Sequence, residues 1–187
     1  MREVSSGKEQ LPEFQRSWTW DNERIRRIIA SLSQGYPMGA IMRLEYGNEN
    51  VRFKCRTIEG VTVTGVTPEF LILDGQQRLT SMYRATCCKE PVETKTEKGK
   101  DIKRYYYLDI KKCLDENEDR VDAVIAVPSD RMIKTNFDRD IVLDLSTREL
   151  MCLRINSCTT ILKIEYSLYI DALIYVLYGE NRAYLYG

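Results

Sequence analysis

Residues 71–81 read Leu-Ile-Leu-Asp-Gly-Gln-Gln-Arg-Leu-Thr-Ser, and this segment is the most informative feature of the sequence. Three apolar residues, an Asp-Gly pair and a helix-forming run predict a buried strand, a tight turn and the start of a helix. The first N–H groups of a helix have no partner inside the helix, and such a terminus binds phosphate readily. The turn also carries one carboxylate, two carboxamides and a guanidinium, so we expect a chemical site here.

The composition is that of a globular protein with one hydrophobic core. The chain has 187 residues, of which 43% are hydrophobic and 30% charged, with 28 basic and 28 acidic residues. This length predicts a single domain, and the zero net charge gives no overall attraction to nucleic acid. Histidine is absent from the sequence. Its absence excludes imidazole general bases, Ser-His or Cys-His triads, His-Cys zinc sites and His-Asn-His nuclease motifs.

The cysteines and the apolar stretches predict a cytoplasmic protein. The cysteines are Cys55, Cys87, Cys88, Cys113, Cys152 and Cys158. They form no C-x-x-C pair, and the start of the sequence shows no signal-peptide pattern, so we expect reduced thiols that serve in packing. The longest apolar stretches, near 161–178, are interrupted by charged residues, so we expect no membrane span.

Periodicity along the chain predicts an α+β fold with one mixed sheet. The expected helices run from Asp21 or Asn22 to Gly35, from Gln77 to about Cys88, and from about Thr160 to Tyr178. The expected strands cover residues 40–46, 51–56, 61–64, 68–73, 105–110 and 121–127. The polar segment 92–103 is expected to be a mobile loop.

Two further segments form a recognisable pattern together with residues 71–81. Residues 11–20 read Leu-Pro-Glu-Phe-Gln-Arg-Ser-Trp-Thr-Trp, and residues 35–39 read Gly-Tyr-Pro-Met-Gly. The three motifs together resemble the signature of the N-terminal domain of GmrSD-type restriction proteins. That signature is Pro-x-Phe-Gln-Arg-x-x-x-Trp, then Gly-Tyr-Pro-x-Gly, then a hydrophobic residue and Asp-Gly-Gln-Gln-Arg-Leu-Thr-Ser. The resemblance is strong over residues 10–90 and holds for the remainder by general layout.

The resemblance implies a ParB/sulfiredoxin-like fold, with a mixed sheet and flanking helices, that binds a nucleotide at a strand–turn–helix. In sulfiredoxins the turn carries Gly-Cys-His-Arg, whereas here it reads Gly75-Gln76-Gln77-Arg78. The reactive cysteine is replaced by Gln76, which excludes reduction of sulfinic acid. In ParB proteins a Gly-Glu-Arg-Arg type of turn holds a nucleoside triphosphate, and that comparison favours phosphate binding.

Five residues are expected to bind the nucleotide. Gly75 allows the sharp turn and the close approach of a phosphate. The hydroxyls of Thr80 and Ser81 lie near the first N–H groups of the helix and can hold phosphate oxygens. From the first motif, Gln15 and Arg16 are expected to approach the same pocket, with Arg16 on phosphate. The plainer alternative is that Arg16 pairs with a surface carboxylate.

Four residues are expected to be catalytic. Asp74 can bind Mg²⁺ or orient the attacking water, and its plainer alternative is to cap the helix. Gln76 and Gln77 can position that water or contact a base edge, and Arg78 can bind phosphate through two hydrogen bonds. Trp18 and Trp20, in contrast, are more typical of core or rim aromatics than of stacking platforms.

The function expected from these residues and from the resemblance is nucleotide hydrolysis with Mg²⁺ in a phage-defence system that restricts modified DNA. The alternative is a non-catalytic DNA-binding or nucleotide-gated switch module of ParB type, and a third hypothesis is phosphotransfer. The DNA-binding alternative relies on a local basic set formed by Arg24, Arg26, Arg27, Arg52, Lys54 and Arg56. We expect the chain to be the N-terminal part of a longer protein that works with a nuclease domain or subunit, and a homodimer stays open.

Overall fold

The computed structural model describes residues 1–47, 53–136, 139–146 and 152–154. Within these ranges helices combine with parallel and antiparallel strand pairs, so the predicted α+β class is confirmed. The helix predicted at about 160–178 lies outside the described residues. In the described part, no helix has the length and apolar character needed to cross a bilayer.

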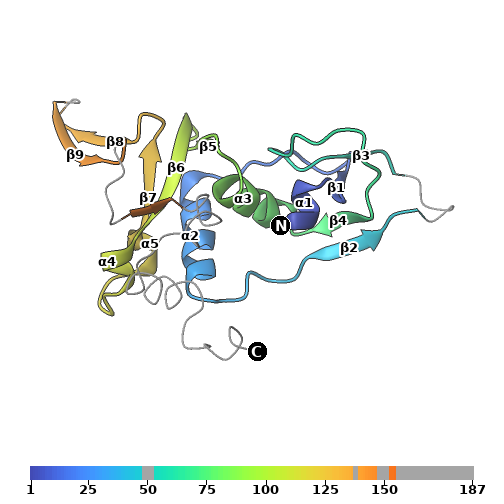
Figure 1. The fold of residues 1–187 in the computed structure, drawn as a ribbon, viewed down its shortest axis with the longest axis horizontal. Helices are drawn as coiled ribbons and strands as arrows, with labels where there is room; N and C mark the ends of the chain where they lie inside the picture. The colour runs from blue at the N-terminus through green and yellow to red at the C-terminus, as the bar shows by residue number, and fades with distance from the viewer. Residues whose placement is uncertain (48–52, 137–138, 147–151, 155–187) are drawn as a thin grey trace, which may run out of the picture.

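The first sheet places the predicted turn at the end of a central strand. Its strands are β1 (Glu9–Pro12), β2 (Met42–Glu45), β3 (Cys55–Arg56) and β4 (Phe70–Asp74). Their order is β2-β4-β1-β3, with β4 antiparallel to β2 and parallel to β1 (Figure 1). β4 thus has a paired strand on each side, and Leu71 and Ile72 in it are fully buried.

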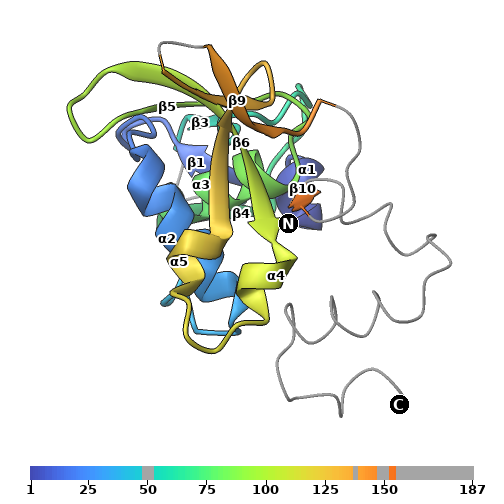
Figure 2. The ribbon, with the colours of Figure 1, turned by 90° about the vertical axis from the view of Figure 1, so that its left-hand side faces the viewer.

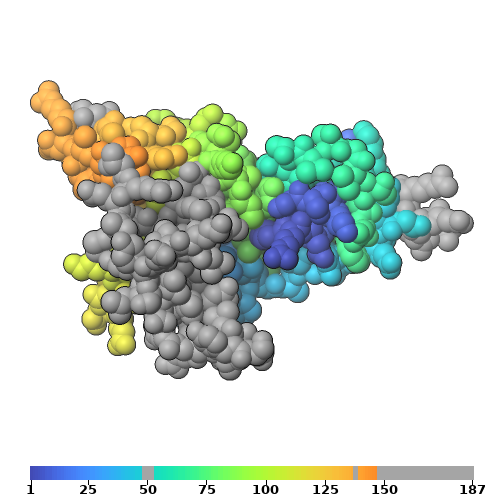
Figure 3. Space-filling view, viewed as in Figure 1, coloured from blue at the N-terminus to red at the C-terminus, as the bar shows by residue number. Residues whose placement is uncertain are grey.

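A second sheet forms around one long strand, so the single sheet expected from the sequence is wrong. Its strands are β5 (Val92–Lys95), β6 (Asp101–Asp109), β7 (Val124–Pro128) and β10 (Cys152–Arg154). β6 pairs antiparallel with each of the other three. Strands β8 (Met132–Thr135) and β9 (Asp140–Asp144) form a separate hairpin. In Figure 3 this hairpin, in orange, lies at one end of the molecule and the N-terminal residues, in blue, lie toward the other.

Two of the five described helices carry the predicted helical segments. The helices are α1 (Arg2–Ser5), α2 (Asn22–Ser33), α3 (Gln76–Thr86), α4 (Ile110–Cys113) and α5 (Arg120–Ala123). α2 and α3 confirm the predictions to within two residues at most ends. Asp21 is the N-cap of α2, and its side chain accepts a 2.9 Å hydrogen bond from the backbone N–H of Arg24.

Helix α3 packs against two separate hydrophobic cores. Its Leu79 and Tyr83 join a cluster with Val4, Leu11, Ile58 and Ile72 beside the first sheet. On a second face, Met82 and Ala85 join a larger cluster built from α2, α4, α5 and the second sheet. Figures 1 and 2 show α3 between the two sheets. The helix that starts at the predicted turn therefore connects both halves of the fold.

Several predicted segments differ from the structure. Residues 92–103 include a hairpin rather than a mobile loop, because Val92 and Thr94 are buried in β5 while Glu93 and Lys95 face solvent. Residues 61–64 form no strand. Of the predicted strand 51–56, residues 51 and 52 lie outside the described residues, 53 and 54 are not in a strand, and Cys55–Arg56 pair as β3. The predicted strand 121–127 starts at Val124, because α5 precedes it.

Arg26 connects α2 to the second sheet. Its Nε donates to the carbonyl oxygen of Val124 at 2.9 Å, and its Nη2 donates to that of Val121 at 2.7 Å. Its Nη1 pairs with Glu23 at 2.9 Å, and only 20% of the side chain is exposed. Arg26 thus satisfies backbone acceptors at the junction of α5 and β7 and is not available to DNA.

We predict that Arg26→Gln lowers the free energy of unfolding by about 1–3 kcal/mol, because half-buried acceptors lose charged donors. The matched control is Arg27→Gln on the exposed face of the same helix, which should change stability by no more than about 0.5 kcal/mol. Urea unfolding measures both variants. Equal stability of the two variants would contradict the role given to Arg26.

Candidate functional site

The predicted strand–turn–helix is present at residues 70–86. β4 ends at Asp74, and Gly75 adopts a φ of +90° as the N-cap of α3. A Cβ atom at Gly75 would lie 3.1 Å from Cγ1 of Ile41, closer than most real contacts. Backbone conformation and space therefore both favour glycine at this turn.

The first turn of α3 has no side-chain cap. Gly75 cannot supply one, and the first bond inside the helix runs from the N–H of Leu79 to the carbonyl of Gly75 at 2.9 Å. The N–H groups of the three residues between them are the unpaired donors expected at any helix start, where partial positive charge gathers. An uncapped start of this kind favours an anion.

Asp74 does not cap the helix, so the plainer alternative for this residue is wrong. Its carboxylate pairs with Nη2 of Arg78 at 3.2 Å, and 72% of its side chain is exposed. Asp74 therefore presents a charged, solvent-accessible carboxylate beside the uncapped turn.

The two glutamines of the turn hold the first motif in place. Nε2 of Gln76 donates to the carbonyl of Arg16 at 2.8 Å. Gln77 accepts a 2.9 Å bond from the N–H of Thr19 and donates a 3.1 Å bond to the carbonyl of Ser17. Both side chains are less than 10% exposed. Their carboxamides thus replace the backbone partners that residues 16–19, which form no regular structure, would otherwise lack.

Gln15 makes the reciprocal contact from the first motif to β4. Its Nε2 donates to the carbonyls of Ile72 and Leu73 at 2.6 and 3.0 Å. The Gln15 carboxamide therefore binds backbone carbonyls at the end of β4, next to the turn where the pocket was predicted.

Arg78 holds the second motif. Its Nη1 donates to the carbonyl of Met38 at 2.6 Å and its Nη2 to that of Ala40 at 2.7 Å. A Cβ atom at Gly39, where φ is +84°, would lie 2.0 Å from Nη1 of Arg78. The last glycine of the Gly-Tyr-Pro-x-Gly motif therefore leaves room for the guanidinium. The three motifs meet because side chains of the third bind the backbone of the other two.

These segments surround a cavity of about 410 Å³, which we call the motif cavity. Its lining residues are Phe14, Gln15, Arg16, Trp20, Leu73, Asp74, Gly75, Gln76, Gln77 and Arg78. Seven of the predicted site residues are thus brought together. Sequence reasoning missed Phe14 and Leu73, although Phe14 lies inside the first motif. Phe14 is 69% exposed, which is unusual for a phenylalanine. An exposed aromatic side chain of this kind often marks a binding site.

Arg16 is the basic residue of the motif cavity whose side chain is available to bind a ligand. Its backbone carbonyl accepts from Gln76, but its guanidinium has no ion pair or hydrogen bond within the described residues. The residue is exposed and lines the cavity. The alternative pairing with a surface carboxylate is therefore not found in the described part of the chain.

Thr80 and Ser81, which were predicted to contact phosphate, lie away from the motif cavity. Both residues are fully buried and neither lines the motif cavity. The Ser81 hydroxyl donates to the carbonyl of Gln77 at 2.7 Å and accepts from Nε1 of Trp18 at 2.8 Å. Helical geometry turns the fifth and sixth residues of α3 toward the core, away from its N-terminus.

The predicted basic set for DNA does not form one surface. Two of its members bind the protein itself: Arg26 as described above, and Arg56 through Glu59 at 2.9 Å. Arg24 pairs with Asp21 at 3.4 Å and Lys54 with Glu13 at 2.8 Å. Arg52 lies outside the described residues, and Arg27 remains exposed. Figure 1 shows α2, which carries Arg24, Arg26 and Arg27, well apart from β3, which carries Arg56.

A metal ion would find one protein ligand in the motif cavity. Asp74 is the single acidic residue among those that line it. Across the described residues, no three His, Cys, Asp or Glu side chains are arranged to hold a metal. Mg²⁺ commonly binds through one or two carboxylates, with water and substrate phosphates as its other ligands. The donor set therefore fits Mg²⁺ together with a phosphate ligand, and the metal role of Asp74 stays a prediction.

Comparison with known proteins identifies the family. Residues 2–171 match the family described as the N-terminal domain of GmrSD restriction endonucleases, and the chain belongs to that family. An uncharacterised protein of Methanocaldococcus jannaschii is 29% identical over 153 residues, which cover 78% of this chain. The chain spans about a quarter of the length of that curated relative.

We predict that Gly39→Ala is more destabilising than Gly35→Ala. Both glycines have positive φ, so each substitution strains the backbone by about 1–2 kcal/mol. Only at Gly39 does the new methyl group displace the Arg78 guanidinium, since nothing lies within 4 Å of the Cβ position at Gly35. Loss of two charged hydrogen bonds should cost about 1–3 kcal/mol more. Urea unfolding measures the difference, and equal losses would contradict the role of Arg78 as the anchor of this loop.

Proposed function

We propose that this member of the GmrSD N-terminal domain family binds a nucleoside triphosphate in the motif cavity and hydrolyses it with Mg²⁺. The observation that carries the proposal is the uncapped N-terminus of α3 beside an unpaired Arg16 in one cavity of about 410 Å³. Donor N–H groups and a guanidinium that converge on one space favour a phosphate group.

The phosphates are best held between the first turn of α3 and Arg16. Gly75 lets the phosphate come close to the backbone, and Arg16 adds a positive charge that no described carboxylate neutralises. Arg78 contributes less directly than the sequence suggested, because its donors are occupied by Met38, Ala40 and Asp74. It acts as a positioning residue that shapes the cavity wall.

Asp74 is the residue assigned to the chemistry. Its exposed carboxylate can bind Mg²⁺ together with phosphate oxygens or orient the attacking water. Gln76 lines the same cavity and uses its Nε2 to hold Arg16, while its Oε1 has no hydrogen bond within the described residues. That oxygen can accept a hydrogen bond from the water. Gln77 has both ends of its carboxamide engaged with the first motif, so we assign it to positioning.

Phe14 supplies an aromatic surface for the base. It packs edge-on against Phe53, with ring centroids 5.5 Å apart, which holds the ring in place while 69% of the residue stays exposed. Stacking on an aromatic ring accepts every base, so this contact predicts affinity with little selectivity among nucleotides.

The family description supports a DNA restriction system as the context of the proposed activity. Phage defence, recognition of modified DNA and a partner nuclease domain are parts of the proposal that rest on the family description. The matched relative is about four times as long as the aligned region, which leaves room there for further domains. A nucleotide-gated switch without turnover uses the same cavity and is the competing function.

We predict that Arg16→Gln weakens binding of a nucleoside triphosphate about tenfold or more, because a charged hydrogen bond to phosphate is lost. Asp74→Asn should reduce Mg²⁺-dependent phosphate release by at least about tenfold, while nucleotide binding without Mg²⁺ stays within a few-fold of the parent. The matched control is Arg27→Gln, which removes an exposed cation that lines no described cavity.

The measurements are calorimetric binding and phosphate release with Mg²⁺ and with a chelator. If neither variant differs from the parent, or if the parent binds no nucleotide, the proposal fails. Nucleotide binding that depends on Arg16 without any phosphate release would support the nucleotide-gated switch. Transfer of the γ-phosphate to an acceptor other than water would instead identify a phosphotransferase.

A further inference from the structure

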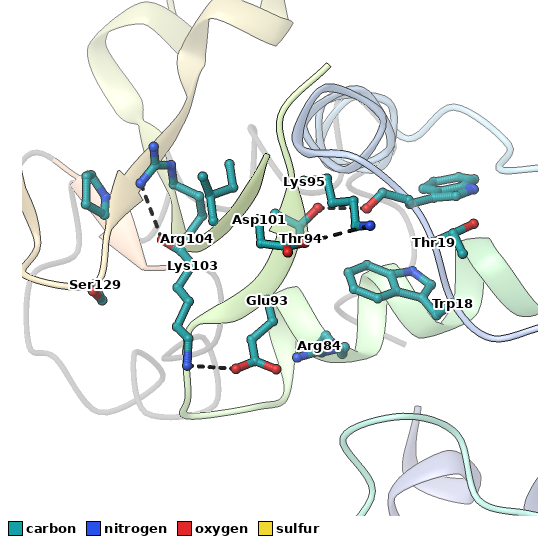
Figure 4. Close-up of a pocket in the computed structure, with 13 residues that line it drawn as sticks. Trp18, Thr19, Arg84, Glu93, Thr94, Lys95, Asp101, Lys103, Arg104 and Ser129 are labelled. Atoms are coloured by element: carbon teal, nitrogen blue, oxygen red, sulfur yellow. Dashed lines mark hydrogen bonds and ion pairs between the residues drawn. The ribbon is translucent and has the colours of Figure 1, made fainter. Parts of the chain in front are cut away.

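A second and larger cavity lies on the other side of the first motif. Its volume is about 720 Å³, within the range that binds small ligands. Residues 18–20, α3, the β5–β6 hairpin and the end of β7 form its walls (Figure 4). Its lining residues include Trp18, Trp20, Arg84, Glu93, Lys103 and Arg104. Of the residues that line this cavity, only those at 18–20 belong to the three motifs of the family signature. The second cavity is therefore distinct from the motif cavity.

One wall of the second cavity is aromatic. Trp18 and Trp20 both line it, and they are the two tryptophans of the whole sequence. Trp18 is fixed from α3, because its Nε1 donates to the buried Ser81 hydroxyl at 2.8 Å. The guanidinium of Arg84 lies over the Trp18 ring, 4.8 Å from its centroid. The indole is therefore held by two residues of α3 that lie one turn apart.

The second cavity has more positive charge than its own carboxylates neutralise. Glu93 pairs with Lys103 at 2.7 Å, and this hydrogen bond lowers the pKa of the Glu93 carboxyl. Asp101 lies 3.8 Å from Lys95. Within the described residues no carboxylate pairs with Arg84 or with Arg104. Arg104 makes one long hydrogen bond, of 3.4 Å, to the carbonyl of Lys103.

We propose that the second cavity binds a nucleotide unit, with its base against the indole wall and its phosphate on Arg104 and Arg84. An aromatic wall favours a flat ring, and two guanidinium groups that form no salt bridge within the described residues favour a phosphate. A nucleotide combines both features at the scale of this cavity. The unit comes either from a free nucleotide or from a nucleic-acid strand, since both carry the same base and phosphate.

The second cavity is connected to the motif cavity through two shared elements. Trp20 lines both cavities, and α3 contributes its first turn to one and Arg84 to the other. A ligand that changes the position of α3 or of residues 14–20 in one cavity therefore acts on the other. By linkage, any such effect on affinity is reciprocal. The binding inference itself stands without the hydrolysis proposed for the motif cavity.

Tryptophan fluorescence can test the inference directly, because both tryptophans line the second cavity. The probes are thymidine, thymidine monophosphate and a short single-stranded thymidine oligonucleotide, each titrated in the presence of a chelator. We expect saturable quenching by at least one phosphate-bearing probe. Saturation by the monophosphate shows that a free nucleotide is sufficient, whereas saturation by the oligonucleotide alone identifies a strand as the source.

The variant Arg104→Gln should weaken binding of the phosphate-bearing probes about tenfold or more, since one charged hydrogen bond is lost. Binding of thymidine should be unchanged, and Arg104→Lys should restore part of the affinity. Arg27→Gln, which removes an exposed cation on α2, is the control that should leave the quenching as in the parent. Thermal melting of each variant shows that the fold is kept.

Three results would overturn the inference. They are the absence of saturable quenching with every phosphate-bearing probe, quenching that Arg104→Gln leaves unchanged, and quenching lost equally in Arg16→Gln. The last result would place the ligand in the motif cavity, which Trp20 also lines.

Discussion

The hydrogen bonds from the first turn of α3 to two irregular segments are the interaction on which the rest of the structure depends. Gln76 and Gln77 bind backbone groups of residues 16–19, and Arg78 binds the carbonyls of Met38 and Ala40. An unpaired buried backbone group costs free energy comparable to a lost hydrogen bond. Three consecutive side chains remove that cost for two segments that belong to no helix or strand, and so they close the motif cavity around the turn.

The same helix explains why the cavity walls keep their positions. Leu79 and Tyr83 are buried in the core beside the first sheet, while Met82 and Ala85 are buried in the core beside the second. A tilt of α3 would open contacts in both cores at once. The first turn is therefore anchored from behind by packing, and its polar side chains can hold the loops in front of it. Packing supplies the rigidity, and hydrogen bonding supplies the shape.

The sequence predicted the parts of the site that depend on local chemistry. The β4–Gly75–α3 turn follows from an apolar run, a glycine and a helix-forming run, and the structure confirms it. Roles that depend on distant partners were not predictable in this way. Thr80 and Ser81 are close to the turn in the sequence, which suggested that they reach the same ligand. The helix instead directs both side chains into the core. Residues 92–103 look like a loop until β6 pairs with β5 and buries Val92 and Thr94.

The arginines show most clearly how contacts separate structural from ligand-binding roles. Arg26 and Arg78 have their donors satisfied by backbone carbonyls and by a carboxylate, so each connects two segments. Arg16, in contrast, faces a cavity and has no such acceptor within the described residues. A guanidinium keeps its charge in proteins, so one that lacks a protein partner still attracts an anion. The sequence alone does not distinguish these arginines. The acceptors that each guanidinium contacts in the fold show whether it connects two protein segments or is available to a ligand.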